Sequence, residues 1–248
     1  MNIIVKTEEE IELMREPCAI VRDCLKFVGE RIRAGMTTKE VDTMVYDFIK
    51  ASGAEPSELG YYGYPASACV SVNEVVVHGI PGDRVLRDGD IVSVDIVAYK
   101  NGFHGDCCRT FCIGNVSEES RRLVKVTEEC FFKGIEDLKA GTPLYDIGYR
   151  VQQHAESNGF SVIRAYTGHG IGREMHEDPS VLNYGRKGTG VRLPENCVIC
   201  VEPMIAAGTW KVDVLPDGWT AVTRDKKCAA HYENTIVVRK DGVEILTL

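Results

Sequence analysis

The 248-residue sequence predicts one α+β domain in which two copies of a helix-and-hairpin module surround a mostly antiparallel sheet. Three observations lead to this prediction. Two helical segments match each other without gaps, two strand segments match at almost the same offset, and an Asn-Gly turn joins two long strands. Matching segments in the same order are typical of a duplicated module. Chance similarity between amphipathic segments is the alternative.

The composition excludes several classes of protein. Hydrophobic residues make up 44% of the chain, charged residues 27%, and the net charge is −8. Nucleic acids and anionic membranes bind basic surfaces, so an acidic chain is not expected to bind either. No apolar run approaches the ~20 residues of a membrane span, and the N-terminal segment becomes acidic too early for a secretory signal. We expect a cytoplasmic protein that binds no DNA and no membrane.

The ten cysteines predict buried thiols. A cytosolic chain of this length neither needs disulfides nor keeps them oxidised. Cys197 and Cys200 form a CxxC pair, but they lie in an apolar segment that predicts a strand, where residues three apart point to opposite faces. A zinc or redox role is the less favoured interpretation. Adjacent Cys107 and Cys108 also point to opposite faces.

Helix signals open the chain. Thr7 and Glu10 form a capping box, and apolar positions at helical spacing continue from there to Ile32. Pro17 inside this run predicts a kink. Residues 117–138 predict a further helix.

Two other helices have distinct starts. Thr37 and Glu40 form a second capping box, and Gly53 ends that helix. Thr142 followed by Pro143 predicts the start of the other, with the threonine as cap and the proline in the first helical position. A glycine ends it as well.

These two helices belong to the repeated part of the chain. Residues 33–53 align on residues 139–159 at a constant offset of 106. Two strand segments, 86–96 and 193–203, align at an offset of 107. The repeat is thus expected to cover roughly residues 33–113 and 139–238 of a single domain, residues 1–248.

The repeat also pairs acidic residues. The strand match places Asp95 at the position of Glu202, and a third match, at an offset of 127, places Asp106 at that of Glu233. Acids at matched positions are expected to converge near the pseudo-two-fold axis.

The hairpin predicts which side chains share a face. Asn-Gly at 101–102 is a strong signal for a two-residue turn. With that loop, Asp95 opposes Cys108 and Asp106 opposes Val97, and all four side chains point to one face. The two carboxylates are then diagonal neighbours, about 7–8 Å apart at the backbone. A bulge in either strand would undo this geometry.

Acids this close repel one another unless positive charge lies between them. With Glu202 and Glu233 added, four clustered acids suit a pair of divalent cations bridged by carboxylates. Solvated acids on the surface are the alternative interpretation.

The six histidines add candidates. His154 lies in a predicted helix and favours a surface or packing role. His104 and His231 each precede an acid by two residues and share its face, either as ligands or in supporting positions. The candidates for function lie in or beside glycine-containing turns, where the backbone can approach a ligand closely: His78, His169 and His176.

Five segments carry a resemblance to a known family: VNEVVVHGIP, DIVSVDIVAYKNGFHGD, GHGIGREMHEDP, VEPM and YENTIVV. In this order and spacing they resemble the type I methionine aminopeptidases. The resemblance covers nearly the whole chain and implies the pita-bread fold shared with creatinase and prolidase. No zinc-binding extension is expected before the domain, and no long insertion separates His176 from Glu202. Both features resemble the short bacterial-type enzyme.

The resemblance implies a set of site residues. Asp95 would be the bidentate ligand of one metal, Asp106 and Glu233 would bridge both, and His169 and Glu202 would bind the second. The methionine pocket would be lined by five side chains: Tyr61, Tyr64, Cys69, Met175 and Trp219. Two positions depart from the family pattern, because Met175 replaces a common phenylalanine and Glu58 stands where a thiol can occur.

The implied activity is removal of the N-terminal methionine from nascent proteins whose second residue is small, through attack of a metal-activated water. His78 and His176 would contact the substrate near the scissile amide, with His176 stabilising the oxyanion. Glu202 would move the proton from water to the leaving amine. Two divalent cations are expected, and the ligands are compatible with Mn, Fe, Co, Ni or Zn. Cys108 could bias that choice.

Expected partners are N-terminal methionine peptides and nascent polypeptides, with the ribosome nearby, and the chain is expected to be a monomer. Two alternatives stay open at this point. An X-Pro aminopeptidase or prolidase would use the same ligands, but usually carries an additional N-terminal domain. A non-catalytic binding module of the same fold would have lost ligands that this sequence keeps.

Overall fold

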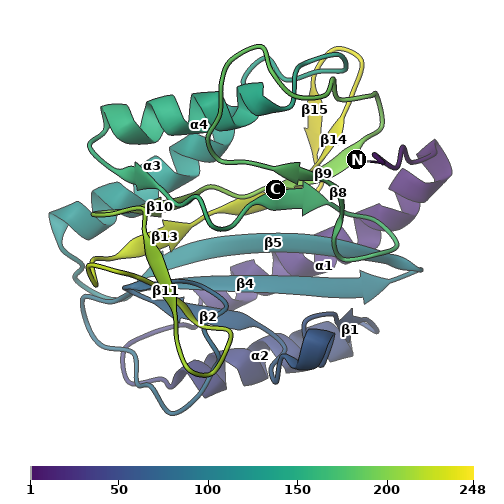
Figure 1. The fold of residues 1–248 in the computed structure, drawn as a ribbon. Coiled ribbons are helices and arrows are strands. Elements are labelled where there is room, and N and C mark those ends of the chain that lie inside the picture. The colour runs from purple at the N-terminus through teal and green to yellow at the C-terminus, as the bar shows by residue number, and fades with distance from the viewer. Residues whose placement is uncertain (1) are drawn as a thin grey trace.

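A long antiparallel hairpin runs across the middle of the molecule (Figure 1). It consists of β4 (Ile91–Lys100) and β5 (Phe103–Cys112) in a computed structural model that describes residues 2–248. The predicted domain boundary at residue 1 lies outside the described residues.

Seven other strands extend the hairpin into a nine-stranded sheet. They are β1 (Glu55–Pro56), β2 (Cys69–Val72), β7 (Gly168–Gly170), β8 (Glu177–Val181), β9 (Val198–Val201), β14 (Glu233–Val238) and β15 (Val243–Ile245). Their order is β1-β4-β5-β14-β9-β7-β8, with β2 beside β4 and β15 beside β14. The pairings between these strands are antiparallel, as predicted.

The predicted register of the hairpin is confirmed. Asn101 and Gly102 have φ angles of 57° and 84°, the left-handed conformation that a two-residue turn requires and that these residue types tolerate. Ten consecutive pairs follow without a bulge, and Asp95 faces Cys108. Because Asp106 lies two residues from Cys108, all three side chains share one face of the sheet.

Four helices form two pairs, one for each half of the chain. α1 (Glu8–Gly29) and α2 (Thr38–Ala51) pack on β2, β4 and β5 over one apolar cluster. α3 (Glu118–Ile135) and α4 (Tyr145–Ser157) pack on each other over a second cluster, which includes side chains of β9 and β14. In Figure 1 the hairpin separates α2 from α4. None of the helices in the described part of the chain has the length and hydropathy of a membrane span.

Two three-stranded sheets and a short helical turn complete the fold. One sheet contains β6 (Ser161–Val162), β10 (Met204–Ala206) and β13 (Ala229–His231), and the other contains β3 (Val75–Val77), β11 (Val212–Val214) and β12 (Ala221–Thr223). The turn η1 (Tyr61–Gly63) follows β1.

We infer that the chain is one domain built from two related modules, residues 33–113 and 139–238. Backbone contacts at matched positions support this inference. The amide of Gly35 donates to the carbonyl of Leu86 at 2.9 Å, and that of Gly141 donates to Leu193 at 2.8 Å. Both glycines have φ angles near 90°. The same pattern continues in two isolated bridges: Thr37 with Val85, and Pro143 with Arg192.

The helix limits differ from the sequence prediction in three places. The first helix ends at Gly29 and not at Ile32; Pro17 lies inside it, as expected. The third ends at Ile135, because Glu136 adopts an extended conformation.

The predicted cap at Thr142 is wrong. The fourth helix begins at Tyr145, and no side chain caps it. The reason is tertiary: the amides of Leu144 and Tyr145 donate to carbonyls of Val191 and Thr189. These hydrogen bonds hold Leu144 and Tyr145 against residues 189–191, so the helix begins only at Tyr145.

The N-terminal helix lies directly against the hairpin at Gly105. A Cβ atom at this position would lie 2.5 Å from the backbone nitrogen of Cys18 and 2.7 Å from the carbonyl carbon of Pro17. Glycine is therefore required here by close approach of two backbones. This contact holds the strand that carries Asp106.

We predict that Gly105→Ala lowers the free energy of unfolding by about 1–3 kcal/mol, because backbone atoms must move to admit the methyl group. The matched control is Gly82→Ala, where a Cβ would meet nothing within 4 Å and φ is not positive. Urea denaturation of both variants measures the difference. Equal stabilities for the two variants would show that the helix can shift freely.

Candidate active site

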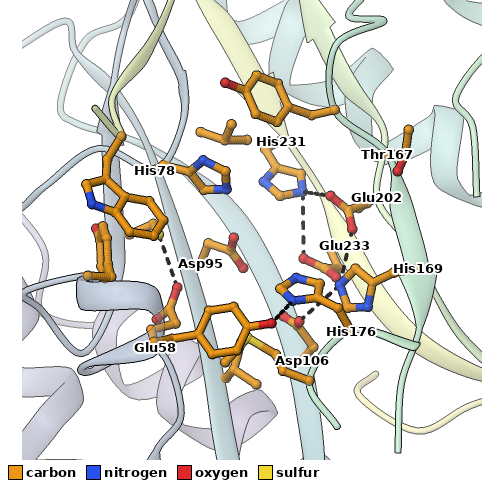
Figure 2. Close-up of a pocket in the computed structure, with 18 of the residues that line it drawn as sticks. Glu58, His78, Asp95, Asp106, Thr167, His169, His176, Glu202, His231 and Glu233 are labelled. Carbon is orange, nitrogen blue, oxygen red and sulfur yellow. Dashed lines mark hydrogen bonds and ion pairs between the residues drawn. The ribbon is translucent and has the colours of Figure 1, made fainter. Parts of the chain in front are cut away.

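All five predicted metal ligands line one cavity of about 310 Å³, and Figure 2 shows their side chains pointing into it. They come from different elements of the sheet: Asp95 from β4, Asp106 from β5, His169 from β7, Glu202 from the residue after β9, and Glu233 from β14.

Strand pairing brings three of the acids together. Cys108 on β5 pairs with Asp95 on one side and with Glu233 on the other. Asp106 lies two residues along the same strand, so its side chain points to the same face. The sheet thus places three carboxyl groups on adjacent strands with a buried thiol between two of them.

His169 lies in the second half of the chain, as Glu202 and Glu233 do, and faces Asp106 of the first half. Its Nε2 lies 3.6 Å from Asp106 Oδ2 and 3.6 Å from Glu202 Oε1. The opposite ring nitrogen, Nδ1, is 2.9 Å from the carbonyl of Gly170, which can only accept a hydrogen bond. Nδ1 therefore carries the proton, and the lone pair of Nε2 is directed toward the carboxylates.

The acids are buried without a compensating cation. Burial raises the pKa of Asp95 to about 7. Burial, followed by the charge of Asp95, raises the pKa of Asp106 well above its usual range. Burial and the charge of Asp106 do the same for Glu202 and Glu233. No lysine or arginine side chain of the described residues lines the cavity.

Several polar atoms in the cavity have no hydrogen-bond partner. They are Asp95 Oδ1, Asp106 Oδ1, Glu233 Oε1, His231 Nε2 and Glu58 Oε2. Buried polar atoms are normally satisfied, so a group of unpaired ones around one space is typical of a site that binds a ligand through them. Carboxylate oxygens with a neutral imidazole are ligands that suit divalent transition metals. The donor set therefore fits metal ions.

Three groups of possible ligands from the described residues overlap in this region; Glu58, Cys69 and Asp95 form one of them, and Glu202 belongs to none. Glu233 links the other two, as expected of a bridging carboxylate. One of these contains Asp106, His169, Cys200 and Glu233, and the other contains Asp95, His231 and Glu233, each with ligand atoms within 4.8 Å of one another. Cys200 was predicted as a buried thiol, and burial raises its pKa well above the usual range.

The two histidines expected to contact substrate line the same cavity. Tyr61 Oη is 2.8 Å from His176 Nδ1, and the His176 ring lies 4.3 Å from that of His169. His78 has a φ angle of 58°, an uncommon conformation for a residue with a side chain. Burial lowers the pKa of His78 to about 4, so its ring is neutral at physiological pH.

All five residues expected to form the methionine pocket line the cavity as well: Tyr61, Tyr64, Cys69, Met175 and Trp219. The Tyr64 and Trp219 rings meet edge to face at 5.1 Å. The single hydroxyl hydrogen of Tyr64 is shared between the carbonyls of Ala68 and Gly79, so the hydroxyl points away from the cavity wall that the ring forms.

Of the remaining three histidines, one lines the cavity and two lie outside it. His231 lines the cavity, whereas His104 does not and instead contacts Ser57 Oγ through Nδ1 at 2.8 Å. His154 pairs with Glu129 outside the site, in agreement with the surface role that the sequence favours.

Sequence reasoning missed four lining residues: Val77, Ala165, Tyr166 and Thr167. Residues 165–167 directly precede the glycine-rich turn that contains His169, which is the signal that could have identified them.

The profile of metallopeptidase family M24 matches residues 12–240. The chain belongs to this family. Within it, the chain is 51% identical to the methionine aminopeptidase of Clostridium perfringens over 246 residues, 99% of each chain, and 46% identical to methionine aminopeptidase 1 of Bacillus subtilis over 245 residues, again 99% of each. These identities confirm the resemblance to methionine aminopeptidases.

Solved structures of the family confirm the pita-bread fold. The crystal structure of methionine aminopeptidase from Rickettsia prowazekii matches with a TM-score of 0.98 at 44% identity, over 100% of both chains. The prolidase from Pyrococcus furiosus matches at 25% identity with a TM-score of 0.80, but the chain covers only 65% of it.

The buried acids predict how the metal-free protein responds to pH. Between about pH 4 and 7, Asp95 binds more proton in the folded state than in the unfolded state, so this group's contribution to stability falls as pH rises. After treatment with a chelator, Mn²⁺ is expected to raise the melting temperature more at pH 7.5 than at pH 5.5. When free Mn²⁺ is present at 100 times its Kd, binding raises the free energy of unfolding by about 2.7 kcal/mol.

Calorimetry at the two pH values measures the effect, with Asp106→Asn as the variant that should lose most of it. Equal gains for both proteins at both pH values would contradict the assignment of these acids to a metal site.

Proposed function

We propose that this protein removes N-terminal methionine from peptides and nascent proteins by metal-dependent hydrolysis of the first peptide bond. One observation carries the proposal: the predicted ligands, the two histidines and the pocket residues line a single cavity. The apolar pocket can hold the side chain of the substrate's first residue, and the two histidines beside the pocket can then contact the first peptide bond. The full-length identity to enzymes named methionine aminopeptidase supports this choice of side chain.

Divalent metal ions are part of the proposal. Asp95, Asp106, His169, Glu202 and Glu233 would hold two of them, chosen among Co, Mn, Fe and Zn. When bound, such ions supply a water nucleophile that is active at neutral pH. The orphaned carboxylate oxygens at the cavity support this ligand assignment.

Glu202 is proposed as the group that moves a proton. It is buried beside His169, and burial raises the pKa of its carboxyl group well above the usual range. In this position it can take the proton of the attacking water and give it to the leaving amine.

His176 is proposed as the donor to the oxyanion. Burial lowers its pKa, so the ring is neutral. If the hydroxyl of Tyr61 donates to Nδ1, the ring proton is held on Nε2, which is then able to donate to the carbonyl oxygen as negative charge develops. His78, whose strained backbone fixes it at the cavity wall, is proposed to hold the amide nitrogen.

Several finer points belong to the same proposal. Selectivity for a small second residue would be steric. The ten cysteines are free thiols, which suits a reducing compartment and supports a cytoplasmic location. Action near the ribosome is part of the same proposal. The protein is proposed to act as a monomer.

The proton-transfer role predicts the effect of Glu202→Gln. Turnover of a Met-Ala peptide should fall at least about 100-fold, because the amide cannot accept the proton. The melting temperature should stay near that of the wild type, and bound metal is measured in parallel. His154→Gln, outside the cavity, is the control that keeps activity. Near-normal turnover by Glu202→Gln would refute the role, and preference for an X-Pro peptide would refute the substrate.

The hydrogen bond between Tyr61 and His176 predicts non-additive effects. His176→Ala should lower kcat by about 10²–10³-fold, as removal of an oxyanion donor does. Tyr61→Phe should lower kcat by a smaller factor, since it acts through the histidine. The double variant should then be no slower than His176→Ala alone. Steady-state kinetics measures kcat for all three variants. If the loss in the double variant equals the product of the two single losses, the two residues act independently.

A further inference from the structure

His231 is a buried histidine beside the acids, and the family resemblance assigns it no role. It is the last residue of β13, two residues before Glu233, and it lines the cavity. Its side chain is 2% exposed, and its Nε2 atom has no hydrogen-bond partner. Because buried polar atoms are normally satisfied, this nitrogen is expected to bind something that enters the cavity.

The distances around Nε2 fit a shared ion better than a hydrogen bond. Nε2 lies 3.8 Å from Glu202 Oε2 and 3.7 Å from Glu233 Oε2, and Figure 2 draws both contacts. A hydrogen bond would need about 3.2 Å or less. Two atoms that bind one ion at about 2.1 Å lie about 3.4 Å apart in a tetrahedral site, so a small shift brings these atoms onto a common ion.

His169, which is already proposed as a ligand, has the same relation to its neighbours. Its Nε2 lies 3.6 Å from a carboxylate oxygen of Asp106 and 3.6 Å from one of Glu202. The two groups of possible ligands that meet at Glu233 each contain one of these histidines, and the group of His231 includes Asp95. Each half of the centre therefore has one imidazole.

The backbone of His231 is fixed by one threonine. Thr110 Oγ1 accepts a hydrogen bond from the amide of His231 at 3.0 Å and donates one to its carbonyl at 2.7 Å. In β13, His231 also pairs with Met204 of β10. The ring is thus held at the cavity wall by main-chain contacts, as a metal-binding side chain requires.

We propose that His231 is a sixth protein ligand of the metal centre and that its Nε2 binds the ion held by Asp95 and Glu233. The inference rests on the proposed metal-dependent function and adds a nitrogen donor to its ligand set. Imidazole suits Zn²⁺, Fe²⁺ and Ni²⁺, whereas carboxylates suit Mn²⁺. A second imidazole therefore shifts the preference of the centre away from Mn²⁺.

NMR with cadmium counts the histidines that bind metal. The full-length protein is prepared metal-free with isotope-labelled histidine and then loaded with NMR-active Cd²⁺ until both sites are filled. A coupling across the cadmium–nitrogen bond is expected for His169 and His231 in the wild type, and for His169 alone in His231→Gln. His104 occupies the matched position of the repeat but contacts Ser57 outside the cavity, so it is the internal control that shows no coupling.

Calorimetry with Zn²⁺ and with Mn²⁺ measures the preference between metals. Loss of a supporting partner lowers metal affinity about 10–100-fold, so loss of a direct ligand in His231→Gln should lower the affinity for Zn²⁺ at least as much. The affinity for Mn²⁺ should fall less, because Mn²⁺ gains less from imidazole. The melting temperature of the metal-free variant shows whether it is folded.

Two results would overturn the inference. One is a cadmium coupling to His169 alone in the wild type, a measurement that needs no variant. The other is an unchanged ratio of Zn²⁺ to Mn²⁺ affinity in a folded His231→Gln, which would give His231 a supporting role only. A failure of the proposed function looks different, because the wild type would then show no cadmium coupling to any histidine and would not cleave a Met-Ala peptide.

Discussion

The burial of four carboxyl groups around one space, with mutual repulsion added to it, is the constraint on which the site depends. Asp95, Asp106, Glu202 and Glu233 are buried around one cavity with no lysine or arginine of the described chain beside them. Their raised pKa values show that the protein alone does not stabilise all four charges. Divalent cations held by these residues would remove this conflict, because they would supply both the charge and the ligand bonds that the orphaned oxygens need.

The fold meets this constraint by placing three of the acids on paired strands. Asp95 and Asp106 lie on a ten-pair hairpin without a bulge, and Glu233 lies on the neighbouring strand. The first helix packs so closely on the hairpin that Gly105 has no space for a side chain. Ligands on paired strands keep their separation, which a metal site requires more than a simple binding pocket does.

Electrostatics divide the cavity into two regions. One contains the acids with His169, and the other contains aromatic and apolar side chains with Glu58 as an unusual polar member. A charged peptide terminus suits the first region, and an uncharged side chain suits the second. The methionine aminopeptidases to which the chain is similar act, by name, on a substrate that has both.

Local patterns in the sequence determined the hairpin register, the shared face of its acids and most helix starts, because turn chemistry and alternation along a strand act over a few residues. The ligand set and the pocket came from the family resemblance. Tertiary structure alone decided the start of the fourth helix, the separation of His231 from His104, and the place of residues 165–167 in the cavity wall. Those outcomes depend on contacts between distant segments, which no local pattern encodes.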